Sequence, residues 1–129
     1  MVTANGDAAA GFTIAEVAAR IGLTAHTLRY YERIGIVPRV ARASSGHRRY
    51  SATDVQFLAL LAHLHATGMP IRRLLAYARL VRRGDATIAA RRALLDEHRC
   101  DVEAKLAHLQ ATHLLICKKL EIYDRKLAA

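Results

Sequence analysis

Polar and basic side chains suited to binding phosphates are concentrated between residues 24 and 50. In an expected helix that begins after Thr24, the outer face carries His26, Thr27, Arg29, Tyr30 and Arg33. The segment after it surrounds the turn signal Ser44-Ser45-Gly46 with basic residues, namely Arg39, Arg42, His47, Arg48 and Arg49. Cations on such a hairpin can reach phosphates beside the groove that the preceding helix enters, which positions a protein on nucleic acid but carries little sequence information.

The distribution of charge also favours a polyanionic partner. The formal net charge is +9, and residues 1–83 carry +8 of it, with 12 Arg, no Lys and 4 acidic residues. Residues 84–129 carry +1, with 8 basic and 7 acidic residues. Nucleic acid is favoured over a membrane surface, because no expected helix pairs a basic face with a broad aromatic one. A basic surface that only maintains solubility is the alternative.

A helix-turn-helix is expected to carry these side chains. Thr13 and Glu16 fit a capping box that starts a helix at the residue after Thr13, and Gly22 is a typical stop. After a turn of about three residues, the length that DNA-reading motifs use, Thr24 can cap a second helix. The inward face of this second helix is expected to hold Leu28 with Tyr31 or Ile34.

A hairpin and two further helices complete the expected DNA-reading domain. Gly35 ends the second helix, and residues 36–50 are predicted to form an extended segment and two short strands, the wing. Residues 51–54 offer caps for a third helix, which residues 68–70 interrupt. A fourth helix follows, with an outer face that carries Arg72, Arg73, Arg79, Arg82 and Arg83. We therefore expect a winged helix-turn-helix domain over residues 12–84.

The C-terminal part is predicted to be one long helix, because the sequence from about Thr87 to Leu127 contains neither Pro nor Gly. Two heptad series follow one face. They hold Leu95, Val102, Leu109, Ile116 and Tyr123, and Arg99, Leu106, His113, Leu120 and Leu127. A single helix cannot bury such a stripe, so a second copy is the expected partner, and folding back onto its own domain is the alternative. Residues 85–129 are therefore predicted to be a coiled-coil dimerisation helix.

Several protein classes find no support in the sequence. Residues 1–11 have neither a basic start nor a long apolar run, so a disordered leader is expected and not a signal peptide. Two cysteines make no disulfide framework and no apolar run reaches the length of a membrane span, which together favour a cytoplasmic protein. We find no motif of an enzyme or of a cofactor site, such as a nucleophile elbow or a phosphate-binding glycine loop.

Taken in order, the motifs from Phe12 onwards resemble the MerR family of bacterial transcription regulators. The resemblance rests on FTIAEVAARIGLTAHTLRYYERIGIV, with LRYYE at residues 28–32, on the wing SSGHRRYSATD, on the helix entry GMPI and on the long C-terminal helix. In that family a winged domain reads operator DNA, and a long helix pairs antiparallel with that of a second subunit. The resemblance therefore implies a mainly α fold, a homodimer and double-stranded operator DNA as partner.

The resemblance also implies roles for individual residues. In the major groove it places Thr24, His26, Thr27, Arg29 and Tyr30. Tyr31 fits the core as well as a contact. Contacts to the DNA backbone are implied for Arg42, His47, Arg48 and Tyr50 of the wing, and for Arg72 or Arg73 of a second wing. Family members bend and untwist promoter DNA in response to an effector, so that RNA polymerase can use it. The effector here is an unidentified small molecule, and an effector-independent architectural DNA-binding protein is the alternative.

Two cysteines bear on what such a regulator would sense. The chain departs from the family's metal sensors, because GDATIAARR at the start of the long helix lacks Cys and no loop follows that helix. It is similar to short members that respond to reactive small molecules or stress. His113 and Cys117 share one helix face, where both can approach a soft or borderline metal. With an antiparallel partner centred near residue 108, Cys100 would be level with Cys117 of the partner subunit. The alternative is that Cys117 is a small buried apolar residue, Cys100 an exposed one and His113 a seam residue that tunes pairing.

Overall fold

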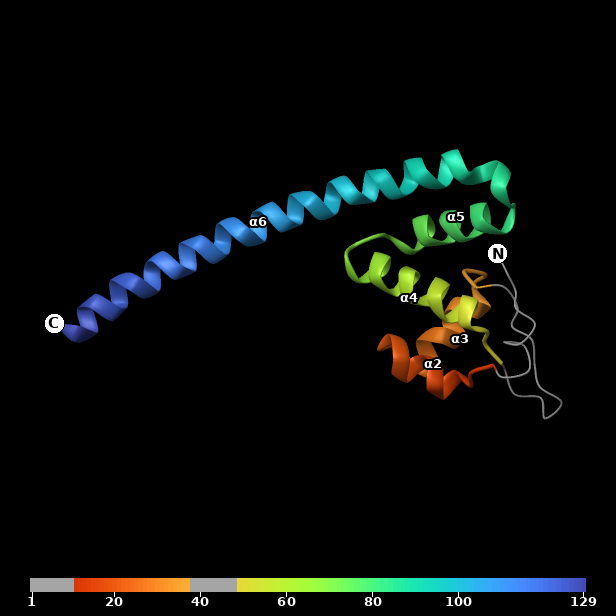
Figure 1. Ribbon diagram of the computed structural model, residues 1–129, viewed down its shortest axis with the longest axis horizontal. Helices are drawn as coiled ribbons and strands as arrows, with labels where there is room; N and C mark the ends of the chain where they lie inside the picture. Colours follow the sequence, from red (N-terminus) through yellow and green to blue (C-terminus); the bar gives the residue numbers. More distant parts are fainter. Residues whose placement is uncertain (1–10, 38–48) are drawn as a thin grey trace. The chain divides into compact units, whose positions relative to one another are not determined.

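The fold is almost entirely helical. The computed structural model describes residues 11–37 and 49–129, and Figure 1 shows their helices in chain order. They are α2 (Ile14–Ile21), α3 (Ala25–Arg33), α4 (Ala52–Ala66), α5 (Ile71–Arg82), the 3-10 helix η1 (Asp85–Thr87) and α6 (Ile88–Ala128). Among the described residues, β structure is limited to one antiparallel bridge between Phe12 and Tyr50. The prediction of a mainly α fold, with a helix-turn-helix and a long C-terminal helix, is confirmed.

The chain divides into two compact units, residues 1–91 and residues 92–129. The division falls inside α6, so the first turn of this helix belongs to the N-terminal unit. The predicted domain boundary between residues 84 and 85 lies at the break before α6. These predicted limits remain predictions, and the expected leader lies almost wholly outside the described residues.

Both helices of the helix-turn-helix begin with side-chain caps that the sequence predicted. At the start of α2, the Thr13 hydroxyl accepts a hydrogen bond from the Glu16 N–H at 3.2 Å, and the Glu16 carboxylate accepts one from the Thr13 N–H at 2.7 Å. Gly22 ends α2 with φ 74°, a left-handed conformation that favours glycine. Thr24 caps α3 through a bond of 3.0 Å from the Thr27 N–H. The turn geometry is therefore specified locally.

The core of the N-terminal unit is built from one face of each helix. α2 packs against both α3 and α4, and α4 packs against α5. The fully buried side chains include those of Val17, Leu28, Tyr31, Leu58, Leu61 and Leu74. Ile36 and Val37, which were predicted to begin an extended segment, are buried in a bend, where their N–H groups donate to the Tyr31 carbonyl. This bend joins the end of α3 to the core.

α4 and α5 meet at the interruption predicted for residues 68–70. Ser51 and Asp54 form a second capping box at the start of α4, with bonds of 2.9 and 3.0 Å. After α4, Gly68 takes φ 105° and Met69 inserts into the core. Tyr77 of α5, which the sequence did not mark as inward, is buried and stacks on Phe57 with 6.3 Å between ring centroids. Aromatic stacking thus joins the two helices.

α6 is a continuous helix of 41 residues. At 1.5 Å per residue it is about 60 Å long. Every residue from 103 to 129 is exposed in the single chain, and this set includes several large apolar side chains. Within the described ranges, no helix combines the length and the apolar character that a membrane span requires.

Candidate nucleic-acid interface

The start of α3 presents hydroxyl groups whose hydrogen bonds are already arranged. The Thr24 hydroxyl accepts from the Thr27 N–H and donates to the Thr27 hydroxyl, with both distances 3.0 Å. The hydrogen of Thr24 is therefore used within the cap, whereas the Thr27 hydroxyl can donate its own hydrogen to an external acceptor. Thr24 acts first as the cap, and Thr27 offers the better external contact.

The outer face of α3 is polar, and its inner face is buried. His26, Arg29 and Tyr30 are exposed, Tyr30 at 37% of its surface, while Leu28 and Tyr31 on the opposite face are each 1% exposed. The Arg33 guanidinium lies 5.6 Å from the centroid of the Tyr30 ring, a cation–π arrangement. All five residues predicted for the major groove therefore lie in a single run at the start and along the outer face of one rigid helix.

Tyr31 belongs to the core, which resolves the choice that the sequence left open. Its hydroxyl lies 3.0 Å from Nδ1 of His65 in α4. This hydrogen bond joins two helices through residues that are 34 positions apart in the sequence. Burial raises the pKa of the Tyr31 hydroxyl, with a smaller contribution from Tyr30, so the hydroxyl stays protonated at neutral pH. The helical period of α4 is compatible with an inward His65, but nothing local in the sequence signals Tyr31 as its partner.

The wing is described only at its last two residues. Arg42, His47 and Arg48, which were predicted to contact DNA, lie outside the described residues. Tyr50, predicted with them, is 1% exposed, and its backbone exchanges two hydrogen bonds with Phe12, at 2.7 and 2.8 Å. A side chain so buried offers no surface to a phosphate, so this geometry corrects the expectation for Tyr50 to a core role.

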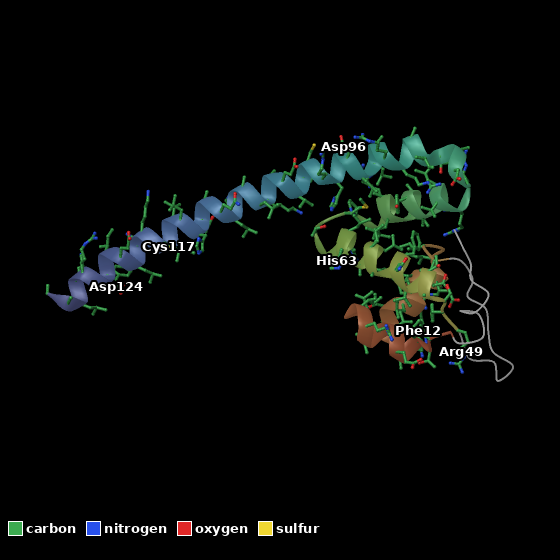
Figure 2. The ribbon with its side chains drawn as sticks, viewed as in Figure 1. Phe12, Arg49, His63, Asp96, Cys117 and Asp124 are labelled. Carbon is green, nitrogen blue, oxygen red and sulfur yellow. The ribbon has the colours of Figure 1, made fainter. Side chains whose placement is uncertain are left out.

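The end of the wing meets the start of α2. Figure 2 shows Phe12 and Arg49 on the same side of the N-terminal unit, consistent with the bridge between Phe12 and Tyr50. The pKa of Glu16 is lowered, mainly by its hydrogen bonds with Thr13 and less strongly by the charges of Arg49 and Arg20. Arg49 therefore adds positive potential beside the N-terminus of α2.

The arginines of α5 divide into two kinds. Arg72 is exposed and Arg73 is partly buried, and these are the two residues predicted for a second wing. Arg82, expected to be simply outward, donates from its guanidinium to the carbonyl of Gly35, at the end of the helix-turn-helix. Arg82 thus links α5 to the end of the α3 segment, a contact that the helical period alone did not reveal.

The predicted dimerisation seam is exposed over most of its length. Leu106, Leu109, Ile116, Leu120 and Tyr123 are all at least half exposed, whereas Leu95 and Val102 are partly buried. Leu114 and Leu115, which lie outside both heptad series, are exposed as well. The apolar surface of α6 is therefore broader than the two predicted series.

The predicted sensor residues all lie on α6. Cys117, labelled in the second half of this helix in Figure 2, has its Sγ atom 3.8 Å from Nε2 and 4.0 Å from Nδ1 of His113. Cys100 and Cys117 are both free and exposed. In the part of the chain that the structure describes, no three or more His, Cys, Asp or Glu side chains group as a metal site would require. One chain thus supplies at most a pair of ligands here.

Comparison with known proteins identifies the family. The model of the MerR helix-turn-helix regulatory proteins matches residues 12–80, which include α2, α3, α4 and most of α5. A helix-turn-helix transcriptional regulator of Haemophilus influenzae is 35% identical over 114 residues, a match that covers 88% of this chain and 84% of the relative. The chain belongs to the MerR family. It is accordingly a helix-turn-helix transcriptional regulator, and its effector is not identified by these relatives.

Other relatives agree with this assignment. The MerR-family chain is 42% identical over 86 residues to the regulator AdhR of Bacillus subtilis, a match that covers 67% of this chain and 61% of AdhR. Among solved structures, HiNmlR has a TM-score of 0.81 at 34% identity, over 92% of this chain and 94% of that one. HiNmlR is described as a MerR family regulator that lacks the sensor domain and is bound to promoter DNA. A MerR family protein of Listeria monocytogenes has a TM-score of 0.79 at 32% identity, over 88% and 86% of the two chains.

Proposed function

We propose that this MerR-family protein binds operator DNA as a homodimer and that α3 enters the major groove. The observation that carries the proposal is the exposed polar face of α3, on a helix that is capped at Thr24 and packed through Leu28 and Tyr31. Rigid presentation of base-reading side chains is what a recognition helix requires. HiNmlR, which resembles this chain over most of its length, is described as bound to promoter DNA.

The proposed base and phosphate contacts of α3 come from Thr24, His26, Thr27, Arg29 and Tyr30. Arg29 is the best reader among them, because a guanidinium can bond two acceptors of a guanine at once. Proposed phosphate contacts come from Arg42, His47 and Arg48 of the wing, and from Arg72 or Arg73 of α5. In a dimer each contact occurs twice, so affinity should fall steeply as the salt concentration rises.

The proposed dimer pairs α6 antiparallel with α6 of a second copy. The exposed apolar side chains of α6 support this pairing, because one helix cannot bury its own seam. The seam residues are Leu95, Val102, Leu106, Leu109, Ile116, Leu120 and Tyr123. Pairing would remove the remaining exposed part of these apolar side chains from water, which stabilises a dimer in proportion to the apolar area buried.

The proposed mechanism is a change in promoter geometry. An effector, a small molecule, selects between two geometries of the dimer, and one of them bends and untwists the DNA so that RNA polymerase can use the promoter. The deformation costs of order 1–6 kcal/mol, which additional protein–DNA contacts offset. Such a regulator works where the chromosome and the polymerase are, in the bacterial cytoplasm.

Chromosomal mapping tests this function against the architectural alternative. The expected result is occupancy at one or a few promoters, with protection on two symmetric half-sites in footprints of the purified protein. Uniform coverage of the chromosome, together with footprints that have no fixed position, would identify an architectural DNA-binding protein instead. Because affinity depends on ionic strength, the footprints are made at a single salt concentration of about 0.15 M.

A thiol- or metal-responsive regulator is the second candidate, favoured by the contact between Cys117 and His113 on α6. A thiolate and an imidazole four residues apart suit a soft or borderline cation, with Cys100 of a second copy as a further ligand. The test replaces Cys100 and Cys117 with Ser, separately and together, and measures induction of a reporter from the mapped promoter. Induction that is unchanged in the double variant excludes this candidate.

A further inference from the structure

A compact set of hydrogen bonds connects α5 to α6. It involves Gly84, Asp85, Thr87 and Arg91, and we name these four residues the α5–α6 joint. All four belong to the N-terminal unit. The joint lies where the unit that carries the recognition helix passes into the helix that we propose to pair with a second copy.

Gly84 fixes the backbone of the joint. Its φ of 90° and ψ of −170° lie in a region that is essentially restricted to glycine. A Cβ atom built at this position would have no heavy atom within 4 Å, so the requirement for glycine comes from the backbone conformation and not from lack of space. The chain therefore leaves α5 through a defined turn.

Thr87 ties the end of α5 to the start of α6. The side chain is buried, at 7% exposure, and its hydroxyl oxygen lies 2.6 Å from the Leu80 carbonyl and 2.8 Å from the Gly84 carbonyl. Leu80 lies in the last turn of α5, and its carbonyl also accepts from the Arg83 N–H at 3.1 Å. The single hydroxyl hydrogen is therefore shared between two carbonyl oxygens, one in the last turn of α5 and one at the residue before η1.

Arg91 extends this network into the first turn of α6. Its Nε donates to the Thr87 hydroxyl at 3.0 Å, and its Nη2 donates to the Gly84 carbonyl at 2.7 Å. The planar guanidinium holds both bonds in one geometry, which a lysine cannot reproduce. The Asp85 carboxylate is 3.9 Å from Nη2 but 98% exposed, so its ion pair contributes little. The orientation of the first turn of α6 relative to the end of α5 therefore depends on the hydrogen bonds of Thr87 and Arg91.

We propose that Thr87 and Arg91 are positioning residues that set the spacing between the two half-sites read by the dimer. The inference rests on the proposed function. In a dimer paired through α6, the direction in which α6 leaves each N-terminal unit decides the distance and rotation between the two copies of α3. The hydrogen bonds of the joint lie within the N-terminal unit and hold the first turn of α6 against the end of α5, whereas a loose linker would let each unit find its half-site independently.

The spacing of half-sites is a sensitive readout of such a joint. One added base pair moves one half-site by about 3.4 Å along the axis and turns it by about 34° relative to the other. A dimer with a rigid joint must strain itself or the DNA to follow this change. A dimer with a loosened joint follows it at lower cost, so it discriminates less between spacings.

The experiment uses the full chain and a duplex selected by the wild-type protein from a random-sequence library. Companion duplexes carry one or two base pairs added or removed between the half-sites, and another carries a single half-site. The variants are Thr87→Val and Arg91→Gln, with Thr87→Ser keeping the hydroxyl. Arg92→Gln removes the same charge from the neighbouring, exposed position and serves as the matched control. Affinities are measured by fluorescence anisotropy at one salt concentration.

The wild type is expected to bind duplexes with altered spacing at least about tenfold more weakly than the selected duplex. A loss of this size corresponds to the cost of about one mismatched base pair in the site. Thr87→Val and Arg91→Gln should bind the selected duplex about tenfold more weakly, because binding must then restrict two loosened joints in each dimer. Their preference among spacings should shrink to about threefold, with single half-site affinity unchanged. Thr87→Ser and Arg92→Gln should match the wild type.

Two results would overturn the inference while leaving the proposed function in place. One is a spacing preference in both joint variants equal to that of the wild type. The other is a loss of affinity for the single half-site equal to the loss for the selected duplex. Thr87 and Arg91 would then affect DNA reading within one N-terminal unit and not the spacing between two units. A wild-type protein without preference for two half-sites would instead refute the proposed dimeric reader. If Thr87→Val melts below the assay temperature by circular dichroism, Arg91→Gln decides the question.

Discussion

The recognition helix α3 and the C-terminal helix α6 use the same helical period for opposite purposes. α3 buries its apolar face, through Leu28 and Tyr31, in the core of its own chain and leaves polar groups outside. α6 leaves its apolar face exposed, from Leu106 to Leu127, beyond the reach of any core in its own unit. An amphipathic pattern therefore predicts that the apolar face of a helix will be buried. Whether the same chain or a second copy buries it depends on which elements lie beside the helix.

The largest effect should follow a charge placed in the exposed seam of α6. Ile116→Asp would put two carboxylates into the proposed dimer interface, where an unpaired charge costs several kcal/mol. Light scattering should show a monomer at micromolar concentration, with the helical content of the N-terminal unit retained. Ala111→Asp introduces the same charge outside the two heptad series and should remain dimeric. An Ile116→Asp protein that stays dimeric would contradict the pairing through α6.

A pair of leucine truncations compares the two regions directly. Leu28→Ala in α3 removes a side chain that is 1% exposed and should lower the free energy of unfolding by roughly 2–5 kcal/mol. Leu115→Ala in α6 removes one that is 66% exposed and lies outside the heptad series, and should change it by less than about 0.5 kcal/mol. Urea denaturation measures both. Equal losses would show that the surface around Leu115 is covered in the assembled protein.

Removal of the guanidinium on the outer face of α3 should affect DNA selection and not assembly. Arg29→Ala is expected to lose roughly 1–3 kcal/mol of discrimination between the selected duplex and a scrambled one, and adding Tyr30→Ala should abolish selective binding. Light scattering should still show a dimer. Arg92→Ala, on α6, is the matched control for loss of positive charge. Undiminished selectivity in the Arg29→Ala, Tyr30→Ala protein would refute the assignment of α3.

The smallest effect concerns the cap that supports the helix-turn-helix. The hydrogen bonds of Glu16 with Thr13 lower the pKa of the carboxyl in the folded state, so its stabilisation is present above the unfolded-state pKa and is lost as pH falls through the folded-state value. The free energy of unfolding of wild type and of Glu16→Gln, measured in urea from pH 7 to pH 3, should therefore converge as the pH falls. If the difference in free energy of unfolding between wild type and Glu16→Gln stayed constant with pH, the ionised carboxylate would not be its source.

The caps of α2, α3 and α4 were predictable because each depends on residues three positions apart. Thr13 with Glu16 and Thr24 with Thr27 follow from local hydrogen-bonding rules. The same rules give the outer face of α3, since its period places Arg29 and Tyr30 opposite Leu28. The sequence was least informative about contacts between distant segments.

The unpredicted features all join residues far apart in the chain or across a helix end. The hydrogen bond from Tyr31 to His65 and the contact from Arg82 to Gly35 exist only once α3 packs beside its neighbours. Tyr50 carried a polar group in a basic segment, which suggested DNA contact, but its pairing with Phe12 buries it. Residues 38–48 lie outside the description, so the predicted contacts of the wing remain predictions.

The continuity of α6 over 41 residues has a consequence for how this protein can change over generations. Substitutions on its outer face leave the geometry of the helix intact, whereas one inserted residue would rotate everything beyond it by about 100° and carry the seam away from its partner. Insertion of seven residues would restore the face, because the apolar pattern repeats with that period. An insertion that keeps the seam on one face of α6 is therefore seven residues long or a multiple of seven.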